Sequence, residues 1–438
     1  MRRPMLDRMA DAVQQAVQEA TRLGAQAAKA RFAQTESINC EFEAGVLKAT
    51  SSEQGRALSL EVIRNGKRAS VTCNDPGDIP ALAARAVALV EIGASAHFSA
   101  YPEPSECAQI IRHCPETASL PREQLIEAGQ RMVEGIRAYS GDLYIGAEAG
   151  RSEAEAVIAH SSGLLHSATT TRWNLGGYAQ KTDGTDMLFC GAGRQWRRLN
   201  HLFDADWVTR ETLRDLRLAE RTASAPTGLA TILAPPEAAA MLFAPLAMAC
   251  SGRSALKGES PLRDKLGDII GPASLTITDQ PHEDWAIESA VMDDCGVPTR
   301  PFTLVDRGVL RAFMYDVDTA AMAGVEPTGH AGCGPVRMHV QPGGRSSAQI
   351  LRGLSEGLIV KNLMGFGQSN LMNGDIAGNV ALGYRVENGE AVGRVKDTMV
   401  AANLYDLLKG GFEASSDVDP LTGWPWILLE GVSVSSGG

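Results

Sequence analysis

The sequence has no long apolar segment. Its longest run without a polar side chain covers residues 238–250, which is thirteen of the 438 residues. A helix that crosses a membrane needs about 20 apolar residues, so this run predicts a buried helix and no membrane partner. Polar residues directly follow Arg2 and Arg3, where a secretory signal would place an apolar stretch of about 7–15 residues. We therefore expect a cytoplasmic protein.

Positive charge is in the minority. The chain has 41 Lys and Arg residues against 52 Asp and Glu residues, which gives a formal net charge of -11. A surface that binds DNA or RNA needs clustered positive charge, because binding neutralises phosphates and releases their counterions. The charge balance therefore argues against direct contact with nucleic acid.

Several familiar catalytic motifs are also missing. The sequence contains no C-x-x-C, H-E-x-x-H, G-x-S-x-G or G-x-x-x-x-G-K-[ST]. It thus has no signature of a zinc-protease helix, a hydrolase nucleophile or a phosphate loop. The eight cysteines are scattered singly, and without an export signal we expect reduced thiols rather than disulfides.

The composition that is present predicts a globular protein of more than one domain. Hydrophobic residues make up 44% of the chain and charged residues 21%, as is typical of soluble proteins. Residues 222–228 are small and polar and include a proline and a glycine, which is typical of a linker. We predict an N-terminal α+β domain at 1–221, a linker at 222–228 and a β-rich C-terminal domain at 229–438.

The first half alternates helical and strand patterns. Apolar residues recur at helical spacing in three stretches, and Asn65-Gly66 is a strong signal for a two-residue hairpin. The order of the elements favours an antiparallel sheet over βαβ units. The predicted helices are 5–31, 79–92 and 121–139, and the predicted strands are 36–48, 55–64, 67–73, 143–149, 153–160 and 165–179.

The second half is predicted to consist mostly of β-strands. A strand is predicted at 230–234 and a buried helix at 237–250, followed by short strands. Glycine turns such as Arg307-Gly308 and Asn388-Gly389 separate those strands.

Residue chemistry alone defines no active site. His330 and Cys333 form an H-x-x-C in a glycine-rich loop, but zinc usually takes three or four protein ligands. Ser369 follows the glycine-rich residues 365–368, which is a weak signal by itself. No spacing pairs a nucleophile with a base.

Six stretches of the second half stand in a distinctive order: 260–267, 328–332, 363–369, 373–378, 386–390 and 402–404. Across roughly residues 228–405, their order and spacing resemble the TldD/PmbA family, metallopeptidases once called modulators of DNA gyrase. The predicted layout of the first half suits the N-terminal domain of that family.

The family resemblance includes a departure at its metal motif. In the TldD branch, two histidines of H-E-x-x-x-H and a later cysteine hold zinc, and the glutamate acts as base. Counting back from residues 260–267, Phe243 and Met248 stand at the histidine positions and Ala244 at the glutamate position. No cysteine follows Cys333. The chain therefore resembles the PmbA branch, also called TldE.

We expect these replacements to bind no metal. Phe243, Ala244 and Met248 offer no ligand that zinc prefers, and Phe243 and Met248 are expected to bury apolar surface instead. Pro245 is expected to strain or kink the predicted helix.

The resemblance implies pairing with a TldD-type paralogue that supplies the zinc, and joint proteolysis of small or unfolded peptides. It assigns no catalytic residue to this chain. Glycine-rich loops are expected to line a channel in which an extended peptide forms backbone hydrogen bonds. The channel candidates are His330, Gly365, Gly367, Ser369, Asn373, Gly374 and Asp375.

Two other classes of function stay open. The chain could be a peptide-binding scaffold that has no protease partner. It could also be an independent hydrolase that uses His330, Cys333 or Ser369.

Overall fold

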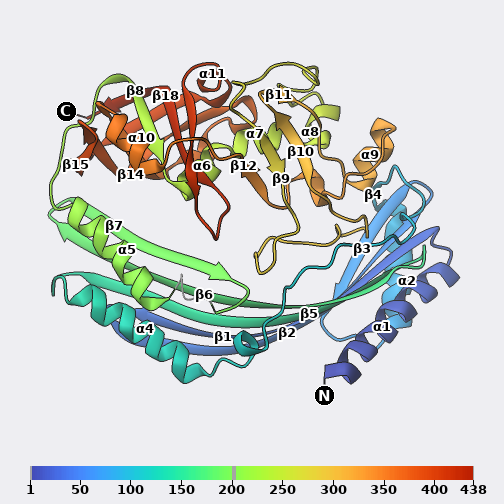
Figure 1. The fold of residues 1–438 in the computed structure, drawn as a ribbon. Coiled ribbons are helices and arrows are strands. Elements are labelled where there is room, and N and C mark those ends of the chain that lie inside the picture. The colour runs from blue at the N-terminus through green and yellow to red at the C-terminus, as the bar shows by residue number, and fades with distance from the viewer. Residues whose placement is uncertain (1, 200–203, 438) are drawn as a thin grey trace.

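The computed structural model describes residues 2–199 and 204–437. In Figure 1 a long arched sheet, coloured blue to green, lies beneath the second half of the chain, coloured yellow to red. Among the described residues, no helix has the length and apolar character that crossing a membrane requires.

The first half forms one antiparallel sheet with the strand order β4-β3-β2-β1-β5-β6-β7. Asn65 and Gly66 both take positive φ angles, as the predicted hairpin requires. The predicted α+β fold is confirmed. The strands are β1 (Ala27–Glu43), β2 (Val46–Arg64), β3 (Lys67–Cys73), β4 (Ala94–Ser95), β5 (Tyr144–His160), β6 (Leu165–Asp183) and β7 (Asp186–Trp196).

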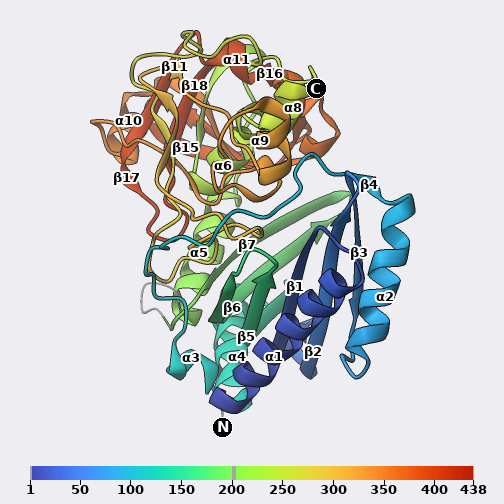
Figure 2. The same ribbon diagram turned by 90° about the vertical axis from the view of Figure 1, so that its right-hand side faces the viewer.

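Helices cover one face of this sheet. On β5, Ile145 and Ala149 join an apolar core with α4, and Val157 and Ala159 join one with α1. These odd-numbered residues share one face, so the opposite face is turned toward the second half of the chain. Figure 2 shows this arrangement from the side. The helices are α1 (Arg2–Arg22), α2 (Ile79–Leu89), α3 (Pro115–Ala118), α4 (Arg122–Arg137) and α5 (Ala205–Leu218), with a 3-10 turn at Val90–Ile92.

The second half contains two more sheets. The larger has the order β13-β8-β18-β16-β14-β15, with β17 paired to β18, and the smaller has the order β11-β10-β9-β12. Their strands are β8 (Gly228–Ala234), β9 (Ile277–Asp279), β10 (Phe302–Asp306), β11 (Val309–Leu310), β12 (Met338–Val340), β13 (Glu356–Met364), β14 (Asp375–Glu387), β15 (Glu390–Arg394), β16 (Thr398–Asn403), β17 (Phe412–Val418) and β18 (Pro425–Ser436).

Short helices connect these strands. The helices are α6 (Pro236–Leu242), α7 (Ala244–Ala249), α8 (Gly252–Leu256), α9 (Val317–Ala323), α10 (Ser347–Gly353) and α11 (Leu404–Leu407). The 3-10 turns are Ala331–Cys333, Phe366–Gln368 and Leu371–Asn373.

Several predicted bounds were wrong. The helix predicted over 5–31 ends at Arg22, because Gly24 turns the backbone with a φ of 94° and β1 begins at Ala27. The strands predicted at 143–149 and 153–160 are one strand, β5, since the polar residues between them stay extended. Strand β7 was not predicted.

The two halves are joined by an exposed segment but share buried surface. Within residues 222–228, the amide of Ala223 donates to the carbonyl oxygen of Arg394 at 2.9 Å. Leu216 of α5 and Tyr384 of β14 belong to one apolar core. The segment therefore connects halves that also pack directly against each other.

Limited proteolysis tests the predicted linker. We expect the first cuts within residues 222–228, because exposed small-residue segments are preferred sites of nicking. The two fragments should co-elute in gel filtration until denaturant is added, since they share a core. Early cleavage within 260–400 would show that the predicted domain map is wrong.

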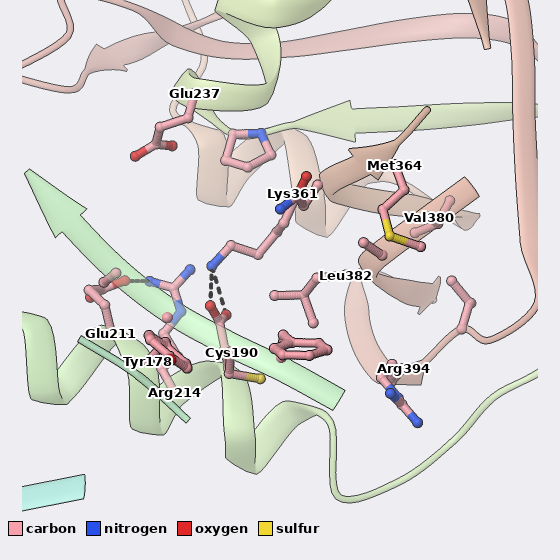
Figure 3. A pocket seen from close by; sticks show the side chains of 18 of the residues that line it. Tyr178, Cys190, Glu211, Arg214, Glu237, Lys361, Met364, Val380, Leu382 and Arg394 are labelled. Atoms are coloured by element: carbon pink, nitrogen blue, oxygen red, sulfur yellow. Dashed lines mark hydrogen bonds and ion pairs between the residues drawn. The ribbon is translucent and has the colours of Figure 1, made fainter. Parts of the chain in front are cut away.

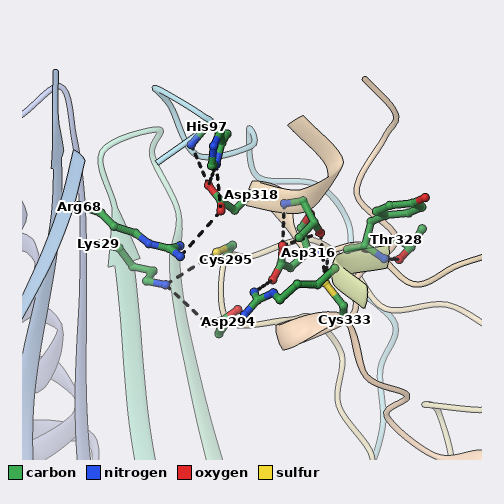
Figure 4. A network of polar contacts seen from close by, with 12 residues as sticks. Lys29, Arg68, His97, Asp294, Cys295, Asp316, Asp318, Thr328 and Cys333 are labelled. Carbon is green, nitrogen blue, oxygen red and sulfur yellow. Dashed lines mark hydrogen bonds and ion pairs between the residues drawn. The ribbon is translucent and has the colours of Figure 1, made fainter. Parts of the chain in front are cut away.

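Polar contacts tie the β4 end of the sheet to the second half (Figure 4). The Nζ atom of Lys29 lies 3.7 Å from Oδ2 of Asp294 and 3.7 Å from Sγ of Cys295. The amide of His97 donates to Oδ1 of Asp318 at 2.8 Å. These contacts fix the position of the second half over this end of the sheet.

Two buried titratable groups lie beside these contacts. Burial, with a smaller effect of Lys29, lowers the pKa of His160 to about 4. Burial raises the pKa of Asp293 to about 6, against hydrogen bonds from the amides of Val297 and Cys295. Both shifts therefore favour the neutral form of the side chain.

These shifts predict opposite pH dependences of stability. Between about pH 6.5 and 4 the unfolded chain protonates His160 before the folded chain does, so this group lowers the free energy of unfolding as the pH falls. As the pH falls from about 6 to 4, the folded chain protonates Asp293 before the unfolded chain does, so this group raises the free energy of unfolding. Each contribution is about 2–3 kcal/mol.

Single substitutions should separate the two contributions. Urea unfolding at pH 7 and pH 4.5 should show that Asp293→Asn loses more stability on acidification than the wild-type protein, and that His160→Asn loses less. For each protein, the change in the free energy of unfolding between the two pH values is compared. The absolute free energies are not compared, because His160→Asn also removes ring packing against Tyr101. The same difference in all three proteins would contradict the prediction.

Candidate functional site

A cavity of about 1000 Å³ runs along β7, the last strand of the first sheet. Its walls come from β7, from α5 and from β13 and β14 of the larger second sheet (Figure 3). We call it the edge cavity. It includes residues from both faces of β7, such as Phe189 and Cys190, so it wraps around the free edge of that strand.

The free edge of β7 follows from its hairpin with β6. Asp183 and Asp186 close a two-residue turn at 184–185. The closing pair of such a hairpin exchanges hydrogen bonds, and the pattern then alternates along the strands. Residues 187, 189 and 191 therefore point their N–H and C=O groups away from β6. Within the described part of the chain, no strand pairs with that edge.

Large apolar side chains stand exposed beside this edge. Tyr178 on β6 is 41% exposed, Met187 on β7 is 59% exposed and Phe189 is 50% exposed. Gly146 makes room for Tyr178, because a Cβ there would lie 2.3 Å from the Tyr178 ring. An extended peptide paired with β7 would place alternate side chains over this surface.

A buried carboxylate links the walls of the edge cavity. Asp215 of α5 is 1% exposed, and its oxygens accept from Nζ of Lys361 at 2.6 and 2.7 Å (Figure 3). The hydroxyl of Tyr384 also donates to Oδ1 of Asp215, at 3.1 Å. Burial and the neighbouring Asp215 raise the pKa of Tyr384, which keeps this hydroxyl protonated.

A second cavity of about 870 Å³ lies between the open face of the first sheet and α6–α7. We call it the floor cavity. Its floor includes Glu148, Arg172 and Asn174, and its roof includes Ala244. Gly193 and Arg194 line both cavities, so the two adjoin at the end of β7.

Arg194 stands at the junction of the two cavities. Its guanidinium forms an ion pair with Glu237, lies 3.6 Å from Asp419 and stacks over the Trp207 ring at 5.0 Å. Burial lowers its pKa, against the two nearby acids Asp419 and Glu211. These contacts hold the β7 end against the second half.

The predicted buried helix is broken at Phe243, within the stretch where the resemblance leads us to expect the metal motif. Phe243 ends α6 and precedes α7, and Pro245 stands in the first turn of α7, where its missing N–H costs no helical bond. The kink expected from Pro245 is present. The Phe243 ring is fully buried against Trp424, with 5.7 Å between ring centroids.

One expectation for this helix was wrong. Met248 was expected to bury apolar surface, but it is 40% exposed, because it falls on the outer side of the short helix α7. Ala244 lines the floor cavity with a methyl group only. The side chains of Phe243, Ala244 and Met248 do not fit a zinc ion. In the part of the chain that the structure describes, no three His, Cys, Asp or Glu side chains cluster as a metal site would require.

The structure places His330 inside the second half. It is 1% exposed, its Nε2 lies 3.1 Å from Oδ2 of Asp279 and its Nδ1 lies 2.8 Å from Oγ1 of Thr328. Its ring therefore does not face an open channel. The Sγ atom of Cys333 lies 3.1 Å from Oγ1 of Thr319, so its contacts are also internal.

The other channel candidates lie in the loop between β13 and β14 and at the first residue of β14; Gly365, Gly367, Asn373 and Asp375 are exposed, and Gly374 is buried. The hydroxyl of Ser369 bonds to the amide and carbonyl of Ala377, and Gly365 and Gly374 take positive φ angles. The loop lies against α7, since the Tyr405 hydroxyl donates to both Pro245 and Met372 carbonyls. The structure thus brings the loop beside the degenerate motif. Neither cavity is lined by any of the seven candidates.

Two family models match the chain. The PmbA/TldA metallopeptidase C-terminal domain matches residues 227–436, and the PmbA/TldA metallopeptidase domain 1 matches residues 28–90. Together they cover more than half of the sequence. The chain belongs to the PmbA/TldD family. The resemblance inferred from the six stretches is therefore confirmed.

Two members of the PmbA/TldD family are similar to this chain in sequence, and a third is similar in structure. Metalloprotease PmbA of Escherichia coli O157:H7 is 31% identical over 60% of this chain and 58% of that protein. A metalloprotease of Methanothermobacter thermautotrophicus is 26% identical over 90% of this chain and 89% of that protein. The structure of TldE from Thermococcus kodakarensis has a TM-score of 0.86 at 21% identity, over 97% of this chain and all of that one, and so has the same fold.

The residues that shape both cavities were not predicted. Asp215, Lys361, Arg194 and Arg172 lie far apart in the sequence and carry no motif. A signal for β7 was present, since Gly184 followed by the apolar run 187–190 suggests a hairpin and a strand.

Replacement of Asp215 tests the link across the edge cavity. Asp215→Ala should lower the free energy of unfolding by about 3 kcal/mol, because it leaves the Lys361 ammonium and the Tyr384 hydroxyl without their partner. The matched control is Glu211→Ala on the same helix, whose ion pair with Arg214 is exposed and should contribute less than about 0.5 kcal/mol. Urea unfolding measures both, and equal effects would contradict a structural role for Asp215.

Proposed function

We propose that this chain is a PmbA/TldE-like, non-catalytic subunit of a cytoplasmic zinc metallopeptidase that acts on small or unfolded peptides. A TldD-type paralogue supplies the zinc ion and the catalytic base. This chain contributes peptide-binding surface, and the two chains form a heterodimer or a higher oligomer.

The helix break at residues 243–248 is the observation that carries this proposal. Phe243 fills its position with a buried ring, Ala244 presents a methyl group to the floor cavity, and Met248 points outward. A metallopeptidase needs ligands for the metal and a base for the water. At the family's motif, this chain has neither.

The free edge of β7 supports a role in peptide binding. It offers unpaired backbone groups beside exposed apolar side chains, and the edge cavity leaves about 1000 Å³ along it. Strand addition to such an edge binds peptides through the main chain with little dependence on sequence. This mode suits small or unfolded peptides, whose sequences vary.

Mixing experiments test the subunit assignment. This chain alone should cleave no unstructured peptide, and a mixture with the TldD-type chain of the same organism should cleave it in a reaction that a metal chelator stops. Ala244→Glu should remain inactive alone, because both histidine positions still lack ligands. Chelator-resistant cleavage by this chain alone would overturn the assignment in favour of an independent hydrolase.

A proline in β7 tests the proposed peptide site. The N–H of Phe189 points away from β6, so Phe189→Pro removes a donor that the sheet does not use. A mixture that contains Phe189→Pro should cleave peptide at least tenfold more slowly than one that contains Phe189→Ala, which loses only the ring. Both variants should unfold at similar urea concentrations. Equal cleavage by the two variants would place the peptide elsewhere.

A further inference from the structure

The floor cavity carries two charges that have no ionic partner among the described residues. Glu148 of β5 and Arg172 of β6 line it, and both are exposed. Other charges on its walls are engaged, since Arg337 donates to Glu288 at 2.9 Å and Arg194 pairs with Glu237. Glu148 and Arg172 are therefore available to a ligand.

The strand register places these two charges at opposite ends of the floor. Glu148 lies opposite Gly176 of β6, and Arg172 is four residues away on that strand. Four residues of strand span about 13 Å. A Cβ at Gly176 would lie 3.1 Å from Oε1 of Glu148, so the carboxylate lies over that end of β6.

Side-chain amides fill the space between the two charges. Asn39, Asn174 and Gln195 stand in one register row across the sheet, in which β5 contributes Gly150. A Cβ at Gly150 would lie 2.3 Å from Oδ1 of Asn39 and 2.7 Å from Oδ1 of Asn174. The side-chain amides of Asn39 and Asn174 therefore occupy the space above Gly150, which a side chain at that position would fill. Amide groups can both donate to and accept from a peptide backbone.

The roof above this floor is small and apolar. Ala240, Ala244 and Ala247 of α6 and α7 line it. Their methyl groups leave the volume between roof and floor free, and they compete for none of the polar groups below.

The Arg172 end of the floor is rich in positive charge. Burial, together with the nearby guanidinium groups of Arg112 and Arg172, lowers the pKa of Arg197 to about 10. The Nε and Nη2 atoms of Arg197 donate to the backbone carbonyls of Ala286 and Ile287. An anion at this end would relieve repulsion among the arginines.

From this arrangement we infer that the floor cavity binds a short peptide of three to four residues with both ends free, its α-ammonium at Glu148 and its α-carboxylate at Arg172. The inference rests on the proposed peptide-binding function and adds the length, direction and end groups of one ligand class. An extended chain spans at most 3.3–3.6 Å per residue, so about four residues match the roughly 13 Å of strand between position 172 and the position opposite Glu148. The row of amides then faces the middle of the peptide backbone.

Calorimetric titration of the full chain with four tetra-alanine peptides tests this inference. The peptides are the free form, the N-acetylated form, the C-amidated form and the doubly blocked form. Blocking either end should weaken binding at least tenfold, because each block removes one charge-assisted contact. Dialanine, which spans only about 7 Å, should not engage both charges at once.

Variants assign each end to its residue. Arg172→Gln should bind the free and amidated peptides equally while still discriminating against acetylation, and Glu148→Gln should show the reverse pattern. Arg131→Gln is the control, because Arg131 is exposed on α4 and pairs with Asp206 outside both cavities. A partly unfolded variant would lose both discriminations together, so this crossed pattern identifies a direct contact.

Three results would overturn the inference. They are equal binding of all four peptides by the wild-type chain, unchanged discrimination in both variants, and no binding of any peptide by the folded chain. None of these results depends on the partner chain or on cleavage, so the mixing experiments judge the subunit assignment separately. Cleavage by the mixture together with a failed titration would remove the short-peptide site and leave the proposed function in place.

Discussion

The open face of the first sheet is the constraint on which the rest of the structure depends. The helices cover only one face of the seven-stranded antiparallel sheet, and the other face carries polar side chains. The second half covers the other face and is held at several places, two of which are separate polar contacts. One is the Lys29 and His97 contacts near β4, and the other is the Lys361–Asp215 pair beyond β7. The floor cavity is the space left between the open face of the sheet and α6–α7.

Buried polar pairs are suited to holding such a gap open. An apolar contact can slide and repack, whereas Asp215 accepts from Lys361 and Tyr384 in one geometry and loses both partners if the halves move. The same holds for Arg194 between Glu237 and Asp419. The polar contacts and the shared apolar core around Leu216 together set the spacing of the halves, and the cavities follow from it.

Local features could be predicted from the sequence, and the two cavities could not. Hairpin and helix signals such as Asn65-Gly66 and the run over 79–92 act over a few residues, and the structure confirms them. The placement of the metal motif at Phe243 and Ala244 by counting stays a prediction. The contact of Asp215 with Lys361 joins residues 146 positions apart, and nothing local to either residue marks it. Exposure was also hard to infer, since Met248 and His330 fall on faces set by the packing of short helices and loops.

The roof and the floor of the central cavity differ in a way that bears on function. At the roof, α6 and α7 contribute only the methyl groups of Ala240, Ala244 and Ala247. The floor keeps an acid, a row of amides and an arginine in register, although exposed polar residues on a sheet face contribute little to folding. A cavity that served only as a remnant of an active site would gain stability by filling with apolar side chains. This one keeps its volume and its polar floor, which is the arrangement expected of a ligand-binding cavity.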